Sequence, residues 1–264
     1  MKAKLTALTS LILVTYSCSS DITEPISSFS FRGDTISVLK IGTYDECQVN
    51  SKSINSDSVL WDLGDGRLSK DTAFLLSYPK SGVYTLKLTA KNNNGQTSVS
   101  AKKVIVLDRV LKKIVINYVQ WDSTNMSEPW PRGFKADIYF QMQMFTDDTM
   151  SPYGFYSKCP ILYTSSTVKN VNNHYYPPIY PAIEIPVSEK IIIDKNLVQF
   201  APGNVNKAYL FSILAKDSSG NNYRLVNNAF YGFGFGITKD DISSNTFIVN
   251  QGGYTSYDLI CDFE

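Results

Sequence analysis

Apolar and polar residues alternate with a period of two in many short stretches of the chain. The clearest stretch covers residues 83–89, where every second side chain would lie on the same face of a strand. One face carries Tyr84, Leu86 and Leu88, and the other carries Val83, Thr85, Lys87 and Thr89. The turn-forming run Asn92-Asn93-Asn94-Gly95 follows and leads into residues 97–107, so we predict a hairpin with this segment as its returning strand.

The second half of the chain shows the same periodicity. Residues 136–144 place one set of large apolar side chains on a common face: Ile138, Phe140, Met142 and Met144. Further strands are predicted at residues 112–119, 183–185, 191–193, 208–216, 223–226, 229–237, 246–249 and 257–263. No stretch has the 3.6-residue period of an amphipathic helix. The pattern therefore predicts an all-β protein.

Length and charge limit what such a protein can be. A chain of 264 residues can form one large domain or two ordinary ones, each with its own core. It carries 25 Lys+Arg and 24 Asp+Glu, a formal net charge of +1, and no basic run is longer than two residues. This distribution does not indicate a nucleic-acid-binding protein. The 17 Tyr and 14 Phe are typical of aromatic-rich β-sandwiches.

The first 17 residues have the features of an export signal. Lys2 and Lys4 precede an apolar stretch at residues 5–14 that is too short to span a bilayer. Small residues and then Cys18 follow, so residues 1–17 resemble a bacterial lipoprotein signal peptide with Cys18 as the acylated first residue of the mature chain. Residues 18–28 would form a tether. The resemblance implies export to the outer membrane or cell surface with the lipid as membrane anchor; an ordinary secretory peptide is the alternative.

Export would place the remaining cysteines in an oxidising compartment. Cys47, Cys159 and Cys261 are an odd number, so at most one pair can form within the chain. Cys159 and Cys261 lie in the same half and are candidates for a disulfide. The alternative is that all three are small buried apolar residues. Because no CxxC motif occurs, a metal site built from thiolates is not expected.

The segment WDLGDG, residues 61–66, has the composition of a ligand loop. A calcium loop of the EF-hand type needs oxygen ligands at alternate positions and a glutamate at the twelfth. Here the third and fifth positions are Gly64 and Gly66, and the twelfth is Ala73. The GxxxxGK[ST] pattern of a phosphate-binding loop is also missing. The glycines permit positive φ and the aspartates can bond the local backbone, so we predict a structural turn, with Trp61 in the core.

The residues that follow give this segment a family context. WDLGDG and then SYPKSGVYTLKLTAKNNNGQTSVSAKKVIVL resemble the PKD domain, although Leu63 replaces the usual phenylalanine. The positions that match the family motif are Trp61, Asp62, Gly64, Asp65, Gly66, Tyr78, Gly82 and Tyr84. The resemblance covers residues 29–108 and implies an immunoglobulin-like β-sandwich that serves as a spacer or a protein-interaction module.

Residues 109–264 resemble the C2-like domain that follows PKD repeats in some bacterial lipoproteins. The matching stretches are Trp121-Asp122, residues 136–140, and residues 209–217 with 230–237. The resemblance implies a second β-sandwich in tandem with the first. The short segment 108–110 is the only plausible hinge, so we expect the two domains to pack end to end.

C2 domains hold Ca²⁺ with loop aspartates, and Asp122, Asp137 and Asp217 match acidic positions of that family. Ala215 replaces a further aspartate, and Ca²⁺ requires six to eight oxygen ligands, so the resemblance implies only a weak calcium site. The alternative is that these carboxylates are solvated loop residues. No other cofactor is indicated.

The segment 146–181 is an insertion that the C2 pattern does not explain. Tyr175, Tyr176 and Tyr180 lie in it among prolines and asparagines, and together with Trp130 they form a candidate ligand surface. Flat aromatic rings beside amides suit sugars or proteins; the alternative is a loop packed over a sheet edge. His174, the single histidine, is expected to be a surface loop residue.

The sequence gives little support for catalysis. A single histidine excludes a histidine-rich metal site, and the GxSxG elbow is missing. No signature marks a pair of glycosidase carboxylates. We therefore expect a non-enzymatic surface protein in which a PKD spacer presents a β-sandwich to a protein or a glycan. The alternatives are a carbohydrate-binding accessory lipoprotein of a glycan-uptake system and a calcium-stabilised adhesion module.

Overall fold

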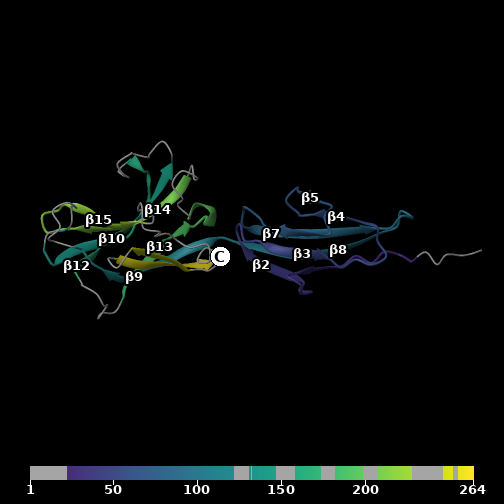
Figure 1. Cartoon of the computed structure of the whole chain (residues 1–264), viewed down its shortest axis with the longest axis horizontal. Coiled ribbons are helices and arrows are strands. Elements are labelled where there is room, and N and C mark those ends of the chain that lie inside the picture. Colours follow the sequence, from purple (N-terminus) through teal and green to yellow (C-terminus); the bar gives the residue numbers. More distant parts are fainter. Residues whose placement is uncertain are drawn as a thin grey trace, which may run out of the picture.

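The computed structural model describes residues 23–121, 131, 133–146, 158–173, 182–198, 207–227, 246–251 and 255–264. In these ranges the elements are β-strands and a 3₁₀ turn at Lys195–Leu197, which confirms the all-β prediction. Figure 1 shows two bodies arranged end to end, with the C-terminus where they meet. Among the described residues, no helix has the length and hydropathy needed to cross a membrane.

The first body consists of two β-sheets. One sheet has the strand order β1-β3-β6, and the other has the order β2-β8-β7-β4-β5. The strands are β1 (Phe29–Phe31), β2 (Val38–Gly42), β3 (Cys47–Ser51), β4 (Ser58–Asp62), β5 (Leu68–Ser69), β6 (Ala73–Leu76), β7 (Gly82–Lys91) and β8 (Thr97–Leu107). In the five-stranded sheet β2 runs parallel to β8, and the other pairs are antiparallel.

Side chains from both sheets meet in one core, whose members extend from Phe29 to Val106. Trp61 is fully buried there, with its ring edge-on to Phe29 and Phe74 at centroid distances of 5.1 and 5.3 Å. Large aromatic side chains contribute most of the buried apolar area of a small sandwich. Trp61 therefore occupies the core position predicted for it.

The hairpin predicted from alternation is formed by β7 and β8. They pair from Gly82 opposite Val106 to Lys91 opposite Thr97, around the turn that begins at Asn92. Leu86, Leu88 and Ala90 of β7 are fully buried, while the residues between them are exposed or half-buried. The period-two pattern thus identified both strands and the buried face of β7.

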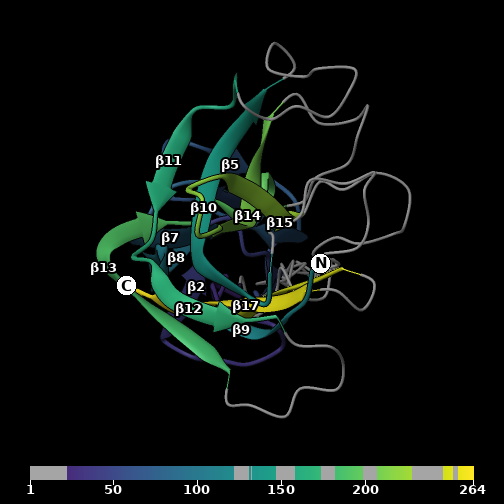
Figure 2. The same cartoon turned by 90° about the vertical axis from the view of Figure 1, so that its left-hand side faces the viewer.

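The second body has a four-stranded sheet of order β13-β9-β17-β16 and a sheet of order β11-β10-β14-β15, in which β12 also pairs with β10. The strands are β9 (Arg109–Val119), β10 (Lys135–Thr146), β11 (Ile161–Thr164), β12 (Val168–Asn172), β13 (Ile183–Ile192), β14 (Lys207–Lys216), β15 (Asn222–Asn227), β16 (Thr246–Gln251) and β17 (Thr255–Phe263). Figure 2 shows β10, β14 and β15 in one layer and β9 with β17 in the other. Their facing side chains form a second core, from Leu111 to Cys261.

The segment treated as an unexplained insertion contains regular structure. Within residues 146–181, β11 and β12 each pair antiparallel with β10 and extend its sheet. Both are short, with four and five residues, and mostly exposed. Short edge strands carry little hydrophobic periodicity, which explains why the sequence pattern did not indicate them.

Both faces of β10 are covered at its C-terminal end. Alternation predicted Met144 on the core side, and it packs half-buried against the second core, but Gln143 and Phe145 on the opposite face are more deeply buried, at 3% and 2% exposed. The Gln143 amide donates to the Cys159 carbonyl oxygen at 3.0 Å and accepts from Arg224 at 2.8 Å. A bulge in the β10–β11 pairing lies at this point. Chain segments therefore cover the outer face of β10 here and bury a polar side chain.

Two predicted segments need separate comment. Residues 183–185 and 191–193 were predicted as two strands, but they belong to one strand, β13, whose pairing with β9 is irregular between Pro186 and Ile191. Proline cannot donate a ladder hydrogen bond, and β13 is an edge strand where it is tolerated. The predicted strand at residues 229–237 lies outside the described residues.

Candidate functional site

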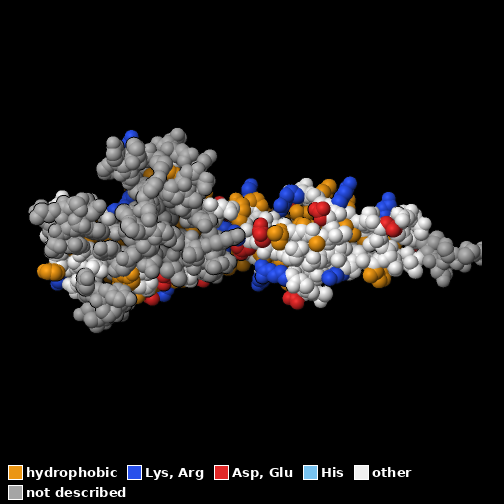
Figure 3. Space-filling view, in the orientation of Figure 1, with side chains coloured by type: hydrophobic (Ala, Val, Ile, Leu, Met, Phe, Trp, Pro, Cys, Tyr) orange, Lys and Arg blue, Asp and Glu red, His pale blue; other side chains and the backbone are white. Residues whose placement is uncertain are grey.

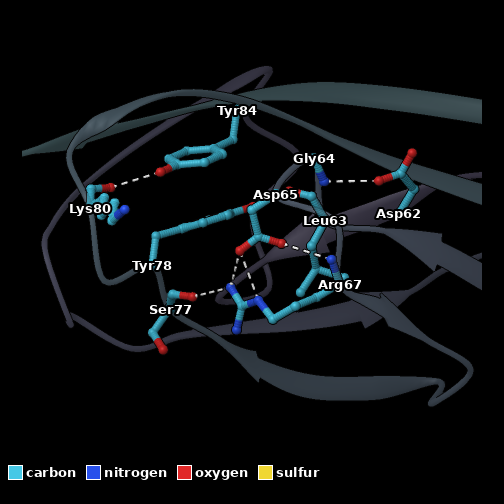
Figure 4. Close-up of polar contacts among 9 residues, drawn as sticks. All are labelled: Asp62, Leu63, Gly64, Asp65, Arg67, Ser77, Tyr78, Lys80 and Tyr84. Atoms are coloured by element: carbon cyan, nitrogen blue, oxygen red, sulfur yellow. Dashed lines mark hydrogen bonds and ion pairs between the residues drawn. The ribbon is translucent and has the colours of Figure 1, made fainter.

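The WDLGDG segment forms a tight turn at the end of β4 (Figure 4). The Asp62 Oδ1 atom accepts the Gly64 amide hydrogen at 2.9 Å, and the Asp65 Oδ1 atom accepts that of Arg67 at 3.1 Å. Gly64 and Gly66 have φ values of 79° and 92°, as the turn prediction requires. Trp61 anchors the turn from the core side, because its indole donates to the Asp71 carbonyl oxygen at 2.8 Å.

Tyr78 and Arg67 close the turn from the other side. The Tyr78 hydroxyl donates to the Leu63 carbonyl oxygen at 2.7 Å in a fully buried contact. Its ring stacks on Tyr84 at a centroid distance of 4.1 Å and lies 5.4 Å below the Arg67 guanidinium. Arg67 in turn donates to the Asp65 carboxylate and to the Ser77 carbonyl oxygen, at 2.8 and 2.6 Å (Figure 4).

These contacts decide what the motif does. Burial, with a contribution from the Asp65 carboxylate, raises the pKa of the Tyr78 hydroxyl well above its ordinary value. Tyr84 donates to the Lys80 carbonyl oxygen at 2.9 Å, and Gly82 begins β7 beside the Tyr84 ring. The polar side chains of the turn thus satisfy the local backbone rather than point into a shared space. The geometry supports the structural interpretation of the motif.

Two of the three candidate calcium ligands lie at one end of the second body, because Asp137 of β10 is opposite Lys216, the residue before Asp217. Asp137 accepts from the Lys169 ammonium at 2.7 Å and from the Asn170 amide at 3.1 Å. The third candidate, Asp122, lies outside the described residues.

Asp217 organises the turn between β14 and β15. Its Oδ1 atom accepts the backbone amides of Ser219 and Asn221 at 2.9 and 3.0 Å, and its Oδ2 atom accepts the Tyr223 hydroxyl at 2.8 Å. Burial opposes ionisation, but these hydrogen bonds outweigh it and lower the pKa of Asp217. In the described part of the chain, no three His, Cys, Asp or Glu side chains gather as a metal site would need.

The remaining candidate residues divide into two groups. Cys18, Trp130, Tyr175, Tyr176, Tyr180 and His174 lie outside the described residues. Cys47, Cys159 and Cys261 are all buried and none is joined in a disulfide, so the structure corresponds to the alternative of three buried thiols rather than a Cys159–Cys261 pair. Burial raises the pKa of Cys261 to about 12, as expected for an unreactive thiol.

The junction between the bodies contains a group of charged and backbone contacts that the sequence did not indicate. Only Asp108 separates β8 from β9, and its amide and carbonyl pair with those of Glu264 at 2.8 and 2.9 Å. The Asp45 carboxylate of the first body accepts from Lys195 of the second at 2.8 Å and lies 3.6 Å from the buried Arg109 guanidinium.

Gly42 completes this contact between the bodies. A Cβ atom there would stand 2.5 Å from the Phe263 ring and 2.6 Å from the Asp45 carboxylate. The Arg109 guanidinium lies over the same Phe263 ring, 5.0 Å from its centre. The first body therefore contacts the last strand of the second closely and through several charged groups, which restricts rotation about Asp108.

Comparison with known proteins gives a match for the first body. Residues 47–105 match the PKD domain family. Collagenase ColA of Clostridium perfringens (strain 13 / Type A) is 30% identical over 98 residues, which cover 37% of this chain but only 8% of the collagenase. The chain thus corresponds to a small part of that relative.

Solved structures include similar modules. The PKD1 domain of the Vibrio cholerae metalloprotease PrtV is 26% identical, with 32% of this chain and 98% of that domain covered and a TM-score of 0.26. A carbohydrate-binding module of the β-sandwich superfamily is 12% identical, with 92% and 99% of the two chains covered and a TM-score of 0.29.

The family match and the geometry of the turn agree on the same residues. The matched segment contains Trp61, the Asp-Gly turn and the Tyr78–Tyr84 stack, all in the contacts described above. Residues 47–105 of this all-β chain are therefore a PKD domain, an immunoglobulin-like module.

Proposed function

We propose that the protein is a non-enzymatic, lipid-anchored protein of the bacterial cell surface, in which the PKD domain is a spacer that presents the second β-sandwich to a protein or a glycan. The observation that carries this proposal is the position of the two connections of the PKD domain. The chain enters at one end of the domain and leaves at the other.

The entry lies at the β7–β8 turn. The Asn92 side-chain amide donates to the Thr23 carbonyl oxygen at 3.4 Å, and the Ser27 hydroxyl contacts the Ser100 hydroxyl and the Leu88 carbonyl oxygen at 2.8 and 2.9 Å. From this turn β8 runs through eleven residues to Asp108, a length of about 36 Å. In Figure 1 the first described residues of the chain lie at the end of the PKD domain opposite the second body. An anchor at Cys18 would therefore be separated from the second body by the length of the PKD domain.

The junction supports the same role. A spacer that ended in a free hinge would let its cargo fold back toward the membrane. The Asp45–Lys195 and Asp108–Glu264 contacts instead hold the second body in line with the first. A non-catalytic role agrees with the chemistry of the motif, where the side chains of Asp62, Asp65 and Tyr78 bond the backbone of their own turn.

The anchoring part of the proposal is tested by Cys18→Ala in a bacterial host. We expect the wild-type chain to incorporate labelled fatty acid, to partition into detergent and to be reached by antibodies on intact cells. The Cys18→Ala variant should lose the label and leave the membrane fraction, whereas the neighbouring Ser19→Ala variant should behave as wild type. Retention of the label in Cys18→Ala would refute anchoring at this residue.

The presentation part is tested by binding. The full chain is applied to an array of polysaccharides and to solubilised surface proteins of the host. We expect a variant with Trp130, Tyr175, Tyr176 and Tyr180 replaced by alanine to lose the ligand that the wild type retains. Equal retention by both chains would show that these aromatic residues are not the binding surface.

A further inference from the structure

The outer face of the five-stranded PKD sheet carries four exposed lysines. Lys40 belongs to β2, Lys103 to β8, and Lys87 and Lys91 to β7. Each alternates with neighbours that are buried or half-buried, so its side chain lies on the solvent side of the sheet. In this fully described part of the chain, none of the four ammonium groups has a hydrogen-bond or ion-pair partner.

Strand register arranges three of these lysines in a straight diagonal. Lys103 lies opposite Thr85 on the antiparallel strand β7, so Lys87 is its diagonal neighbour on one side. It also lies opposite Val38 on the parallel strand β2, which makes Lys40 its diagonal neighbour on the other side. Diagonal neighbours in a sheet are about 7–8 Å apart. The row Lys40–Lys103–Lys87 is therefore a regularly spaced line of positive charge.

Apart from one carboxylate, the surroundings of the row are uncharged or apolar. Leu60, Val83 and Val99 on the same face are 41%, 64% and 57% exposed. Among the outward positions of β2, β4, β7 and β8, all of them described, Asp62 is the one acidic residue. It lies on β4, opposite Lys87, and its Oδ1 atom accepts the Gly64 amide. Figure 3 shows basic, acidic and hydrophobic side chains on the visible side of this body. A soluble surface ordinarily intersperses both signs of charge in similar numbers, whereas on this face four lysines meet a single carboxylate.

We propose that this sheet face is a second binding surface, which takes a linear anionic polysaccharide that carries carboxylate or sulfate groups. A flat face with evenly spaced lysines is complementary to an extended chain with repeated negative groups. The exposed leucine and valines offer apolar contact to the carbohydrate rings between those groups. Thr85 and Thr89 offer hydroxyl groups along the same path.

The direction of the face favours a polysaccharide over a lipid surface. β7 and β8 run along the long axis of the molecule, and so does the face that they form (Figure 1). If the PKD domain stands on the membrane as the proposed function requires, this face is perpendicular to the bilayer and cannot lie on lipid headgroups. A surface polysaccharide can run along it. This step rests on the proposed function, although binding itself can be measured without any anchor.

The test compares two charge-matched triple variants of the full chain. The first, Lys40→Gln/Lys87→Gln/Lys103→Gln, removes the row; the second, Lys52→Gln/Lys70→Gln/Lys80→Gln, removes three exposed lysines that lie outside this face. Binding to polygalacturonate, dextran, phosphatidylserine vesicles and duplex DNA is measured by titration calorimetry at low and at high salt. Circular dichroism and thermal melting verify that both variants are folded.

We expect the wild type to bind polygalacturonate but not dextran, with an affinity that falls as salt screens the charges. Exposed ion pairs are individually weak, so removal of the row should lower the affinity about tenfold, and the second variant should stay within about twofold of wild type. Equal loss in both variants would overturn the proposal, because net charge alone would then explain binding. The proposal would also be overturned if the wild type did not bind polygalacturonate, or if it bound vesicles or DNA more tightly at equal anionic charge. If Cys18→Ala kept the fatty-acid label and anchoring at Cys18 were refuted, this binding result would be unaffected.

Discussion

At the scale of single residues, Gly64 and Gly66 have similar backbone conformations and different surroundings. Both have positive φ, but a Cβ at Gly64 would lie 2.8 Å from the Thr85 carbonyl oxygen, whereas nothing lies within 4 Å of one at Gly66. Gly66→Ala should therefore lower the unfolding free energy only by the conformational strain it introduces, about 1–2 kcal/mol. Gly64→Ala should lower the unfolding free energy by about 1–3 kcal/mol more, because the β7 backbone must shift.

Urea unfolding of both variants measures this difference directly. Since the conformational strain is common to the pair, the gap in unfolding free energy reports the contact with β7. Equal stability of the two variants would show that the turn is not held against Thr85.

Tyr78 gives a second prediction at this scale. Tyr78→Phe removes the hydroxyl that donates to the Leu63 carbonyl and leaves a buried acceptor unsatisfied, which should lower the unfolding free energy by about 1–3 kcal/mol. Tyr84→Phe is the matched control, because its hydroxyl bonds the Lys80 carbonyl in an exposed position and should matter less.

The effect of Tyr78→Phe should also depend on pH. Burial raises the pKa of Tyr78 in the folded state, so its contribution is fully present below the unfolded pKa of about 10 and is lost as the pH rises toward the folded pKa. The stability gap between wild type and Tyr78→Phe should be constant below pH 10 or so and narrow above it. A gap that widens in alkali would contradict the assignment.

At the scale of elements, the turn between β14 and β15 depends on the Asp217 carboxylate. Asp217→Asn should lower the melting temperature at neutral pH, because the ionised carboxylate accepts from Ser219, Asn221 and Tyr223. The pKa of Asp217 is lowered in the folded state, so this stabilisation is present above the unfolded pKa of about 4 and is lost as the pH falls through the folded value. The difference between the variants should therefore disappear in acid.

Calorimetry of the same pair with added Ca²⁺ or EDTA separates this role from metal binding. We expect neither addition to change the melting temperature of the wild type. A calcium-dependent rise that Asp217→Asn abolishes would instead assign the carboxylate to a calcium site, as the C2 resemblance implied.

Strands with one buried and one exposed face were predictable from the sequence. β8 was predicted with its observed bounds, and β17 buries Tyr257, Leu259 and Cys261 as its alternation required. These strands have a one-sided environment, which is the condition under which a period of two appears. The PKD turn was predictable for a related reason, since its glycines and aspartates are required by backbone geometry.

The features that were not predictable depend on long-range contacts. Gln143 is buried because Cys159 and Arg224 meet it from distant parts of the chain, and no local pattern encodes that meeting. Asp45 and Lys195 are 150 positions apart. The lysine row was predictable only in part. The predicted alternation placed Lys87 on the outward face, but its diagonal alignment with Lys103 and Lys40 depends on the register of three strands.

At the scale of the whole molecule, the junction determines whether the two bodies move together. Asp45 accepts from Lys195 and lies beside the fully buried Arg109, so Asp45→Ala removes a carboxylate that two cations share. Charged hydrogen bonds of this kind contribute about 1.5–3 kcal/mol. We expect small-angle X-ray scattering of Asp45→Ala to fit a broader range of orientations than the wild type.

Asp45 also accepts the Gly42 amide at 2.9 Å, so its loss disturbs the first body as well as the junction. Lys195→Met separates the two effects, because its ammonium contacts Asp45 across the junction. Both variants should therefore broaden the scattering ensemble, and Asp34→Ala, at an exposed turn of the first body, should leave it unchanged. If Lys195→Met scatters as the wild type does, the backbone pairing of Asp108 with Glu264 is sufficient to fix the orientation. The junction would then be rigid without its charged contacts.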